Sequence, residues 1–454
     1  GLAGAGAYLA LTTTVLWATG CAAGGAGERH KAHLSELGRL GRDVASERTL
    51  SGPLFEGAEV LERRSLIELV LERNPTVEAS RQAWRSAIAR YPQEKALADP
   101  GVSYSFAPQS IGADDARFGN VVGVTQHFPF PGKRGLRGLA ALAEADAAQH
   151  DYEATRLTLA LITSTLFDDY YATERSLEVN EEHVALVEEL KQSAEARYAV
   201  GRASMQDPLQ AEVELAHLEH QRIVLETQRS VVVAQLNGLL HRPPEAQLPR
   251  PPLKLSPPAL PGLGSKALQE EALRARPELL AAGARIDGAE SILSLKKREY
   301  YPDFTLGGSY NSMWGEPDHR FMVGLAINLP IQFGTRRAAT EQAQATLSLR
   351  QHELEGAADD VRVAVEQARA RVVEASHVLT LYDERLIPAA RDQLAAARSG
   401  FESGQNTFLA VIEGEKNLRA VELAAEVALA DAHRRAAELW RTVGRFPWTN
   451  KEER

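Results

Sequence analysis

The segment Phe321-Met-Val-Gly-Leu-Ala-Ile-Asn-Leu329 alternates between large apolar residues and small or polar residues. This period of two is typical of a β-strand, whose successive side chains point to opposite faces. A tilted strand of about 9–11 residues crosses a membrane. An apolar face suits lipid, and a face of small or polar residues suits water. We therefore predict a strand over residues 321–329 with the length and the two faces of a transmembrane strand.

Three further segments share this pattern: residues 100–106, 120–128 and 304–310. In the first of them, Val102 and Tyr104 fall on the apolar face. Four strands are too few to close a barrel, and an unpaired strand edge is not tolerated in lipid. The strands therefore predict one of two arrangements. Either several copies of the chain complete a barrel, or the strands form two soluble hairpins packed on helices.

A long helical pattern follows each pair of strands, over residues 134–199 and 335–402. In the second pattern, apolar residues recur at alternating steps of four and three, which is the a/d heptad of a coiled coil. These residues are Val361, Val365, Ala368, Val372, Ala375, Leu379, Tyr382 and Leu386. A helix of about 65 residues is roughly 100 Å long. Pro388 lies within the pattern and predicts a kink near its end.

These segments belong to an internal duplication. Leu71-Glu-Arg-Asn-Pro-Thr-Val77 matches Leu273-Arg-Ala-Arg-Pro-Glu-Leu279, which begins 202 positions later. Further matches in the same order are Gly132-Lys-Arg134 with Gly334-Thr-Arg336 and Tyr198-x-x-Gly201 with Phe401-x-x-Gly404. Matches at a fixed offset indicate a repeated structural unit. Each copy is predicted to contain a helix (65–98 or 265–299), two strands, the long helix, a Gly-marked turn and a closing helix (206–240 or 406–443).

The predicted boundaries divide the chain into six parts. These are a signal and lipobox segment (1–21), an irregular N-terminal tail (22–60), the first repeat (61–241), a linker (242–264), the second repeat (265–445) and a C-terminal tail (446–454). The linker contains eight prolines, and such a run is extended rather than helical.

The single cysteine, Cys21, follows an uncharged stretch with an apolar run from Tyr8 to Trp17. An apolar run that ends in small residues is typical of a secretory signal. The small residues before Cys21 are similar to a bacterial lipobox, whose cysteine is lipidated after cleavage. The alternative is an N-terminal membrane anchor, because residues 1–20 are long enough to span a bilayer. Both interpretations predict that the chain is exported.

Composition and missing motifs argue against several functions. The net charge of −10 argues against nucleic acid as a partner, because phosphate binding needs a basic face. The sequence has no phosphate-binding loop, zinc-protease motif or nucleophile elbow. We therefore predict neither enzymatic activity nor a cofactor. His217 and His220 share a helix face, but a metal site needs further ligands, and none is predicted.

These features together resemble the TolC-like family of outer-membrane efflux proteins. The resemblance covers about residues 60–445 and rests on the duplication, on Asn74-Pro75 and Arg276-Pro277, and on the two Gly-marked turns. It also rests on Gln126-His-Phe-Pro-Phe-Pro-Gly-Lys133. That motif is most similar to the branch that serves heavy-metal and related RND-type pumps.

The resemblance implies a mainly α-helical fold with a small β-barrel part. Three copies would give a 12-stranded barrel in the outer membrane and a 12-helix tunnel in the periplasm. The implied partners are two further copies of the chain, outer-membrane lipid, a periplasmic membrane-fusion adaptor and an inner-membrane RND-type pump. The implied function is a passive, lipid-anchored exit duct, with heavy-metal cations among its candidate substrates.

The resemblance also implies entrance residues beside the Gly-marked turns. Asp207 falls where family members have an aspartate that holds neighbouring hairpins together, and Asn406 replaces its basic partner. In the second copy, Glu413 keeps the carboxylate of one of two ring aspartates, and Ala410 replaces the other. Three copies of Glu413 around one axis would favour cations. The alternative for Asp207 and Glu413 is a solvated charge near a helix end.

Two other functions stay open. The same duct could serve type I protein secretion in place of small-molecule efflux. Alternatively, the chain is a periplasmic coiled-coil scaffold lipoprotein without a channel, in which the strands form soluble hairpins.

Overall fold

The computed structural model describes residues 25–41, 55, 59–112, 119–258 and 264–447, so Cys21 and the predicted signal segment lie outside the described part.

The first copy contains α2 (Arg63–Arg73), α3 (Pro75–Lys95), β1 (Gly101–Phe106), a 3₁₀ turn (Pro108–Ser110), β2 (Asn120–Phe128), α4 (Lys133–Ala199) and α5 (Gln206–Leu239). The second contains α6 (Ser265–Ala275), α7 (Pro277–Arg298), β3 (Phe304–Asn311), a 3₁₀ turn (Pro317–His319), β4 (Phe321–Ile327), α8 (Phe333–Leu381), a π-helical turn (Tyr382–Leu386), α9 (Ile387–Glu402) and α10 (Phe408–Val443). The two copies therefore run through one order of elements. Among the described residues, no helix has both the length and the apolar character needed to cross a membrane.

The chain divides into two compact units. Unit 1 comprises Gly1–Glu47, Ser80–Asp151 and Glu278–Ala357. Unit 2 comprises Arg48–Ala79, Tyr152–Pro277 and Ala358–Arg454. Unit 1 contains the strands, and unit 2 contains the two Gly-marked turns. Each unit includes segments from both copies of the repeat.

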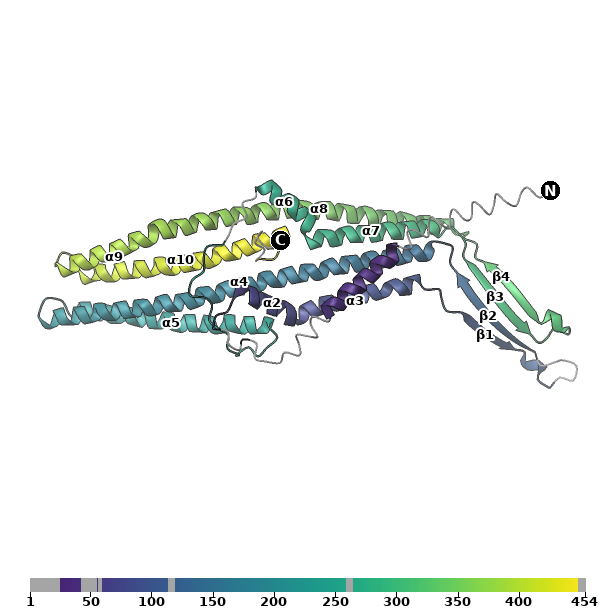
Figure 1. The fold of residues 1–454 in the computed structure, drawn as a ribbon, viewed down its shortest axis with the longest axis horizontal. Coiled ribbons are helices and arrows are strands. Elements are labelled where there is room, and N and C mark those ends of the chain that lie inside the picture. Colours follow the sequence, from purple (N-terminus) through teal and green to yellow (C-terminus); the bar gives the residue numbers. More distant parts are fainter. Residues whose placement is uncertain (1–24, 42–54, 56–58, 113–118, 259–263, 448–454) are drawn as a thin grey trace. The chain divides into compact units, whose positions relative to one another are not determined.

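The four strands of unit 1 form one antiparallel sheet in the order β1-β2-β3-β4 (Figure 1). The register aligns the predicted faces across the sheet, since Tyr104 pairs with Val122, and Val122 pairs with Tyr310. On the other face, Ser103 pairs with Gly123, which pairs with Ser309. The alternation predicted from the sequence is therefore confirmed, and one face of the sheet is apolar while the other is small or polar.

A helix over residues 25–41 corrects the prediction that 22–60 has no regular structure. The segment is rich in Glu, Lys, Arg, Leu and Ala, which favour helix strongly enough to offset its glycines. The helix belongs to unit 1. His33 Nε2 lies 2.8 Å from Asp146 Oδ1 of α4, and Trp84 Nε1 of α3 donates a hydrogen bond of 3.3 Å to His33 Nδ1.

The first helix of each copy is broken, which corrects the continuous helices predicted over 65–98 and 265–299. Asn74 and Arg276 have extended backbones, with φ −68° in both and ψ 124° and 121°. Proline disfavours helical geometry in the residue before it and is well suited to the first position of a helix. The Asn74 side chain then caps α3, because its Oδ1 accepts a 2.9 Å hydrogen bond from the Thr76 N–H. The Asn-Pro and Arg-Pro motifs thus mark a helix boundary.

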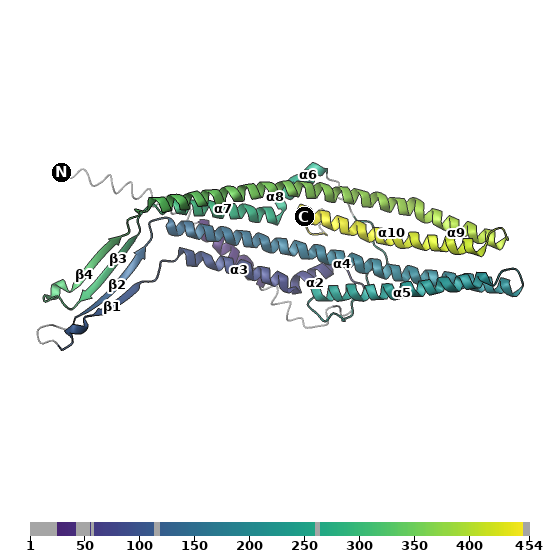
Figure 2. The same cartoon turned by 180° about the vertical axis from the view of Figure 1, so that it is seen from behind.

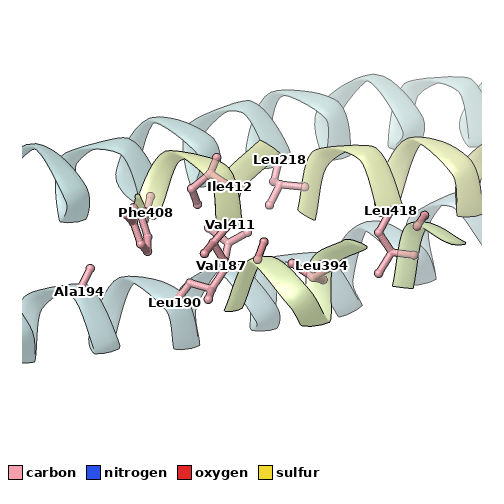
Figure 3. Packing of buried hydrophobic residues seen from close by; sticks show 12 residues of the cluster. Val187, Leu190, Ala194, Leu218, Leu394, Phe408, Val411, Ile412 and Leu418 are labelled. Carbon is pink, nitrogen blue, oxygen red and sulfur yellow. The ribbon is translucent and has the colours of Figure 1, made fainter. Parts of the chain in front are cut away.

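The helical hairpins of the two copies share one apolar core in unit 2. Figures 1 and 2 show α9 beside α10 in both views, and Figure 3 shows side chains from the four helices meeting. The core residues are Val187, Leu190 and Ala194 of α4, Ala211 and Leu218 of α5, Ala390, Leu394 and Ala397 of α9, and Phe408, Val411, Ile412 and Leu418 of α10. The duplicated hairpins are therefore partners in packing.

A π-helical turn displaces the predicted heptad seam. The seam is buried from Val361 to Ala375, but Leu386 is 36% exposed. A continuous heptad would place the next seam residues at positions 389, 393 and 396, whereas the buried residues are Ala390, Leu394 and Ala397. A π turn holds one extra residue, which accounts for the shift by one. Pro388 has no backbone N–H, and the predicted interruption therefore takes this form just before it.

Replacing Leu218 tests the shared core. Leu218→Ala leaves a cavity among four helices, and we expect the free energy of unfolding to fall by about 2–5 kcal/mol. Leu209 lies on the same helix with 48% of its surface exposed, and Leu209→Ala should cost about 0.5 kcal/mol or less. Denaturant titration of both variants measures the difference. Equal losses would show that the hairpins do not pack as described.

Candidate functional site

Most large side chains on the apolar face of the sheet are exposed within the described residues. Val323 is 85% exposed, Phe321 is 76% exposed and Val102 is 75% exposed. Single exposed apolar residues are ordinary on protein surfaces, but a contiguous face of this kind marks a contact with lipid or with another protein. The edge strands β1 and β4 each have one neighbour in the sheet, so their outer edges present unpaired backbone groups.

The junction between the sheet and the long helices contains a buried ion pair. Lys133 Nζ donates hydrogen bonds to Asp303 Oδ1 at 2.8 Å and to the Tyr301 carbonyl oxygen at 2.9 Å. The backbone N–H of Phe130 donates to the same Asp303 oxygen at 2.6 Å. Only 5% of the Lys133 side chain is exposed. The motif that ends in Lys133 therefore holds β2 and β3 on the first turn of α4, and sequence analysis did not identify Asp303.

The matched arginines have the same role in both copies. Arg134 Nε donates to the Lys95 carbonyl oxygen at 2.8 Å, and Arg336 Nε donates to the Glu299 carbonyl oxygen at 2.9 Å. Each arginine begins a long helix and ties it to the end of the preceding one. Gly132 has φ +90°, and the Arg298 guanidinium occupies the space that a Cβ would need. Only glycine fits this position without strain.

The two hairpin turns have the same backbone conformation at their glycines. Gly201 and Gly404 have φ of 73° and 75°. The Gly201 N–H donates to the Tyr198 carbonyl oxygen at 2.9 Å, and the Gly404 N–H donates to the Phe401 carbonyl oxygen at 3.1 Å. A left-handed glycine with these hydrogen bonds is a common way to end a helix. The repeated Tyr/Phe-x-x-Gly motif is therefore a helix-ending signal.

The structure places the three predicted entrance residues in or beside the first two turns of α5 and α10. Asp207 is half-buried in the first turn of α5, whereas Asn406 and Glu413 are exposed. The Asn406 side chain lies against Gly400, where a Cβ would come within 2.2 Å of its Nδ2. Within the described part of the chain, no hydrogen bond or ion pair joins Asp207, Asn406 and Glu413.

A buried ionic cluster lies in the same hairpins, and sequence analysis missed it. Glu415 and Glu422 of α10 lie against the two ring nitrogens of His183 on α4, at 2.8 Å and 3.0 Å. Glu214 of α5 is 1% exposed and pairs with Lys416 at 2.7 Å and Arg419 at 2.8 Å. Glu415 lies 203 positions after Glu212, the same offset as that between Tyr198 and Phe401. That match alone does not predict a cluster.

The histidines provide no metal site in the part of the chain that the structure describes. His217 and His220 are exposed on α5. His127 lies on the polar face of the sheet, where its Nδ1 is 3.2 Å from Thr305 Oγ1. Glu415 and Glu422 contact opposite sides of His183, so their oxygens do not converge on one point. Across the described ranges, no group of three or more His, Cys, Asp and Glu side chains is arranged to hold a metal ion.

Comparison with known proteins places these features in a family. The family described as outer membrane efflux protein matches residues 66–241 and 268–445. The chain is 24% identical over 413 residues to the outer membrane efflux protein BepC of Brucella suis, a match that covers 84% of this chain and 85% of BepC.

Two further relatives match over shorter stretches. The chain is 24% identical over 269 residues to the cobalt-zinc-cadmium resistance protein CzcC of Cupriavidus metallidurans, covering 56% of this chain and 60% of CzcC. It is 27% identical over 165 residues to the outer membrane protein TolC of Vibrio cholerae, covering 34% of this chain and 37% of TolC. These two matches span less than two thirds of either relative.

A solved structure supports the fold. The crystal structure of the outer membrane protein VceC from Vibrio cholerae has a TM-score of 0.70 and 18% identity, covering 84% of this chain and 96% of VceC. The family match extends over both copies of the repeat, from α2 to α5 and from α6 to the residues after α10. The chain therefore belongs to the outer membrane efflux protein family and is a protein of the bacterial outer membrane.

Proposed function

We propose that the chain is one protomer of a homotrimeric exit duct that conducts substrates passively through the outer membrane. The observation that carries this proposal is the exposed apolar face of a four-stranded sheet with two open edges. Lipid tolerates the face but not the edges, because unpaired backbone groups in lipid cost several kcal/mol each. If β1 of each copy pairs with β4 of the next, three copies close a 12-stranded barrel, as in our sequence prediction.

The helical hairpins supply the second part of the duct. Each copy of the repeat contributes one hairpin to the shared core of unit 2. Three chains would thus supply 12 helices for a tunnel in the periplasm. Its entrance would lie at the Gly201 and Gly404 turns. An adaptor protein and an inner-membrane RND-type pump would meet the duct there, and the pump would supply the energy for transport.

Glu413 is the best candidate for a residue that selects charge at the entrance. It is exposed in the second turn of α10, so its carboxylate is available to other copies or to solutes. Three such carboxylates around one axis would create a negative field that attracts cations. Asp207 and Asn406 are secondary candidates, and they would contact a neighbouring hairpin.

Heavy-metal cations are the substrate class that we favour. The support is the likeness to CzcC, whose name records cobalt, zinc and cadmium resistance, together with the motif that ends in Lys133. Type I protein secretion would use the same duct with a different pump. A periplasmic scaffold without a channel remains the alternative from a different class, and it requires that the sheet is not in lipid. The lipid anchor at Cys21 stays a prediction.

Two adjacent residues of β4 test whether the apolar face meets lipid. Val323 lies on the apolar face and Met322 on the opposite face. We expect Val323→Arg to cost about 2–4 kcal/mol if it lies near the bilayer midplane and to remove most of the protein from outer-membrane fractions. Met322→Arg should be tolerated, because that face would be wet. Equal tolerance of both variants would favour the scaffold without a channel.

Cation selectivity tests the role of Glu413. In planar bilayers, Glu413→Gln should lower the ratio of K⁺ to Cl⁻ permeability, because it removes three charges from a narrow entrance. Glu402→Gln is the matched control, since Glu402 is an exposed carboxylate in the same helical hairpin. An unchanged ratio in Glu413→Gln would leave Glu413 as a solvated charge.

The cargo is tested by deleting the gene and exposing cells to panels of metals, dyes and antibiotics. Sensitivity to divalent metals that the intact gene reverses is the expected result. Sensitivity to drugs without any sensitivity to metals would contradict heavy-metal cations as the substrate. Loss of a secreted protein with unchanged resistance to all panels would favour the secretion duct.

A further inference from the structure

The hydrogen-bonding state of His183 follows from its position between two carboxylates. His183 is buried, with 3% of its side chain exposed, and its Nδ1 lies 2.8 Å from Glu415 Oε1. Its Nε2 lies 3.0 Å from Glu422 Oε2. The two glutamates are seven residues apart on α10, which is about two helical turns, so they share one face. The imidazole of the first copy is thus held by the closing helix of the second copy.

If both glutamates are ionised, only a doubly protonated ring fits this geometry. A neutral imidazole has one N–H donor and one lone pair, whereas an ionised carboxylate can only accept hydrogen bonds. With a neutral ring, one nitrogen lone pair would face a carboxylate oxygen about 3 Å away without a proton between them. Arg391 Nη2 donates to the second glutamate, Glu422, at 2.9 Å, which favours its ionised form. With Glu415 ionised as well, both ring nitrogens of His183 carry protons.

The electrostatics agree with this assignment. Burial alone would lower the pKa of His183, but hydrogen bonds and charge from Glu415 and Glu422 outweigh burial and raise the pKa to about 9. The pKa of Glu422 is lowered, chiefly by its hydrogen bond with His183 and also by Arg391. His183 is therefore charged at neutral pH.

Charged groups from all four helices surround the ring. Arg419 Nη1 lies 3.7 Å from Glu415 and 2.8 Å from Glu214, which Lys416 also contacts. The complete cluster consists of His183 on α4, Glu214 on α5, Arg391 on α9, and Glu415, Lys416, Arg419 and Glu422 on α10. If His183 loses its charge, the cation that remains beside Glu415 is Arg419, whose Nη1 is 3.7 Å away. The Glu415 side chain is fully buried. An underpaired buried carboxylate is costly, so the contact between α4 and α10 depends on the proton.

The cluster lies beside the apolar core and near the predicted entrance. On α4, His183 is one turn before Val187, and on α10, Glu415 lies between Ile412 and Leu418. Figure 3 labels the core residues Val187, Ile412 and Leu418. Glu413 lies two residues before Glu415, which is a rotation of roughly 200° around the helix. Burial of Glu415 against His183 therefore directs Glu413 away from the core.

We propose that His183 is a positioning residue, an imidazolium that ties α10 of the second copy to α4 of the first and fixes where Glu413 points. Loss of this charge releases the α9–α10 hairpin. We call this contact between His183 and the two glutamates of α10 the tie. The evidence for the tie is the ionic cluster, and only its effect on conduction rests on the proposed duct.

The sign of the pH dependence follows from the raised pKa. An unfolded histidine has a pKa of about 6.5, and His183 in the fold has one of about 9. The stabilisation by the proton is therefore complete below about pH 6.5 and is lost as the pH rises through about 9. Alkaline pH should loosen the hairpin, and mild acid should not.

Hydrogen-exchange mass spectrometry of the full chain tests the tie. At pH 7, His183→Gln should raise the exchange rate of amides in residues 415–422 by about tenfold or more, because local opening becomes easier. The wild type should approach the variant by pH 10 after correction for base-catalysed exchange. His220→Gln is the control, because His220 is exposed on α5, and it should match the wild type. Equal exchange at pH 7 in wild type and His183→Gln would overturn the proposal.

A charge-preserving variant covers the case in which His183→Gln does not fold. His183→Lys keeps a cation whose ordinary pKa is about 10.4, so protection should persist at pH 9 and be lost only at higher pH. Loss of protection near pH 9 in both wild type and His183→Lys would overturn the proposal, because the pH response would then arise elsewhere.

Planar-bilayer conductance separates the tie from the duct. A duct with the tie predicts higher open probability in His183→Gln than in wild type at pH 7. Altered exchange without conductance in any variant would refute the proposed function and leave the tie intact. Normal conductance with unaltered exchange would refute the tie and leave the duct intact.

Discussion

The unpaired backbone groups along the outer edges of β1 and β4 are the constraint on which the rest of the structure depends. Within the described residues, each of these strands has one neighbour in the sheet. In water the edges could be solvated, but lipid offers no donors or acceptors, and the protein belongs to an outer-membrane family. In the proposed duct, other copies of the chain pair with these edges, and lipid covers the apolar face.

The duplication gives the two copies similar helical hairpins, whereas the charged side chains on those hairpins differ between the copies. The apolar core of unit 2 takes residues from both hairpins, and apolar contact alone is not directional. The ionic contacts are directional and cross between copies. Besides the His183 cluster, Arg63 of α2 pairs with Asp168 of α4 within the first copy and donates a hydrogen bond of 2.9 Å to His433 Nδ1 of α10 in the second copy. Burial raises the pKa of Asp168 to about 7, and Arg63 offsets only part of that effect.

Local sequence patterns predicted the features that depend on residues close together in the chain, such as strand faces and the heptad seam. The period of two along residues 321–329 predicted a strand and its faces, and the register confirms both over Phe321–Ile327. The heptad from Val361 predicted the buried seam, but one extra residue in the π turn shifted it, and no local pattern announces such a turn. The breaks at Asn74 and Arg276 were missed although the following prolines signal them. A more careful use of proline would have found them.

Contacts between residues far apart in the chain could not be predicted from the sequence. His183 and Glu415 are 232 residues apart, and Lys133 and Asp303 are 170 residues apart. Nothing in either local sequence distinguishes these side chains from solvated charges on a helix. The entrance residues came from resemblance to a family, and no hydrogen bond or ion pair joins them within the described residues. The roles that we propose for them depend on neighbouring copies, which a single sequence does not place.

Cysteine cross-linking between strand edges tests the central claim most directly. In a Cys21→Ser background, single cysteines at several positions along β1 are combined with single cysteines along β4, and the protein is oxidised in native outer membranes. A trimeric barrel predicts covalent species of two and three chains and none larger for pairs at one register, because the ring closes at three. Monomers at every register, or a ladder that continues beyond three chains, would contradict a trimeric barrel.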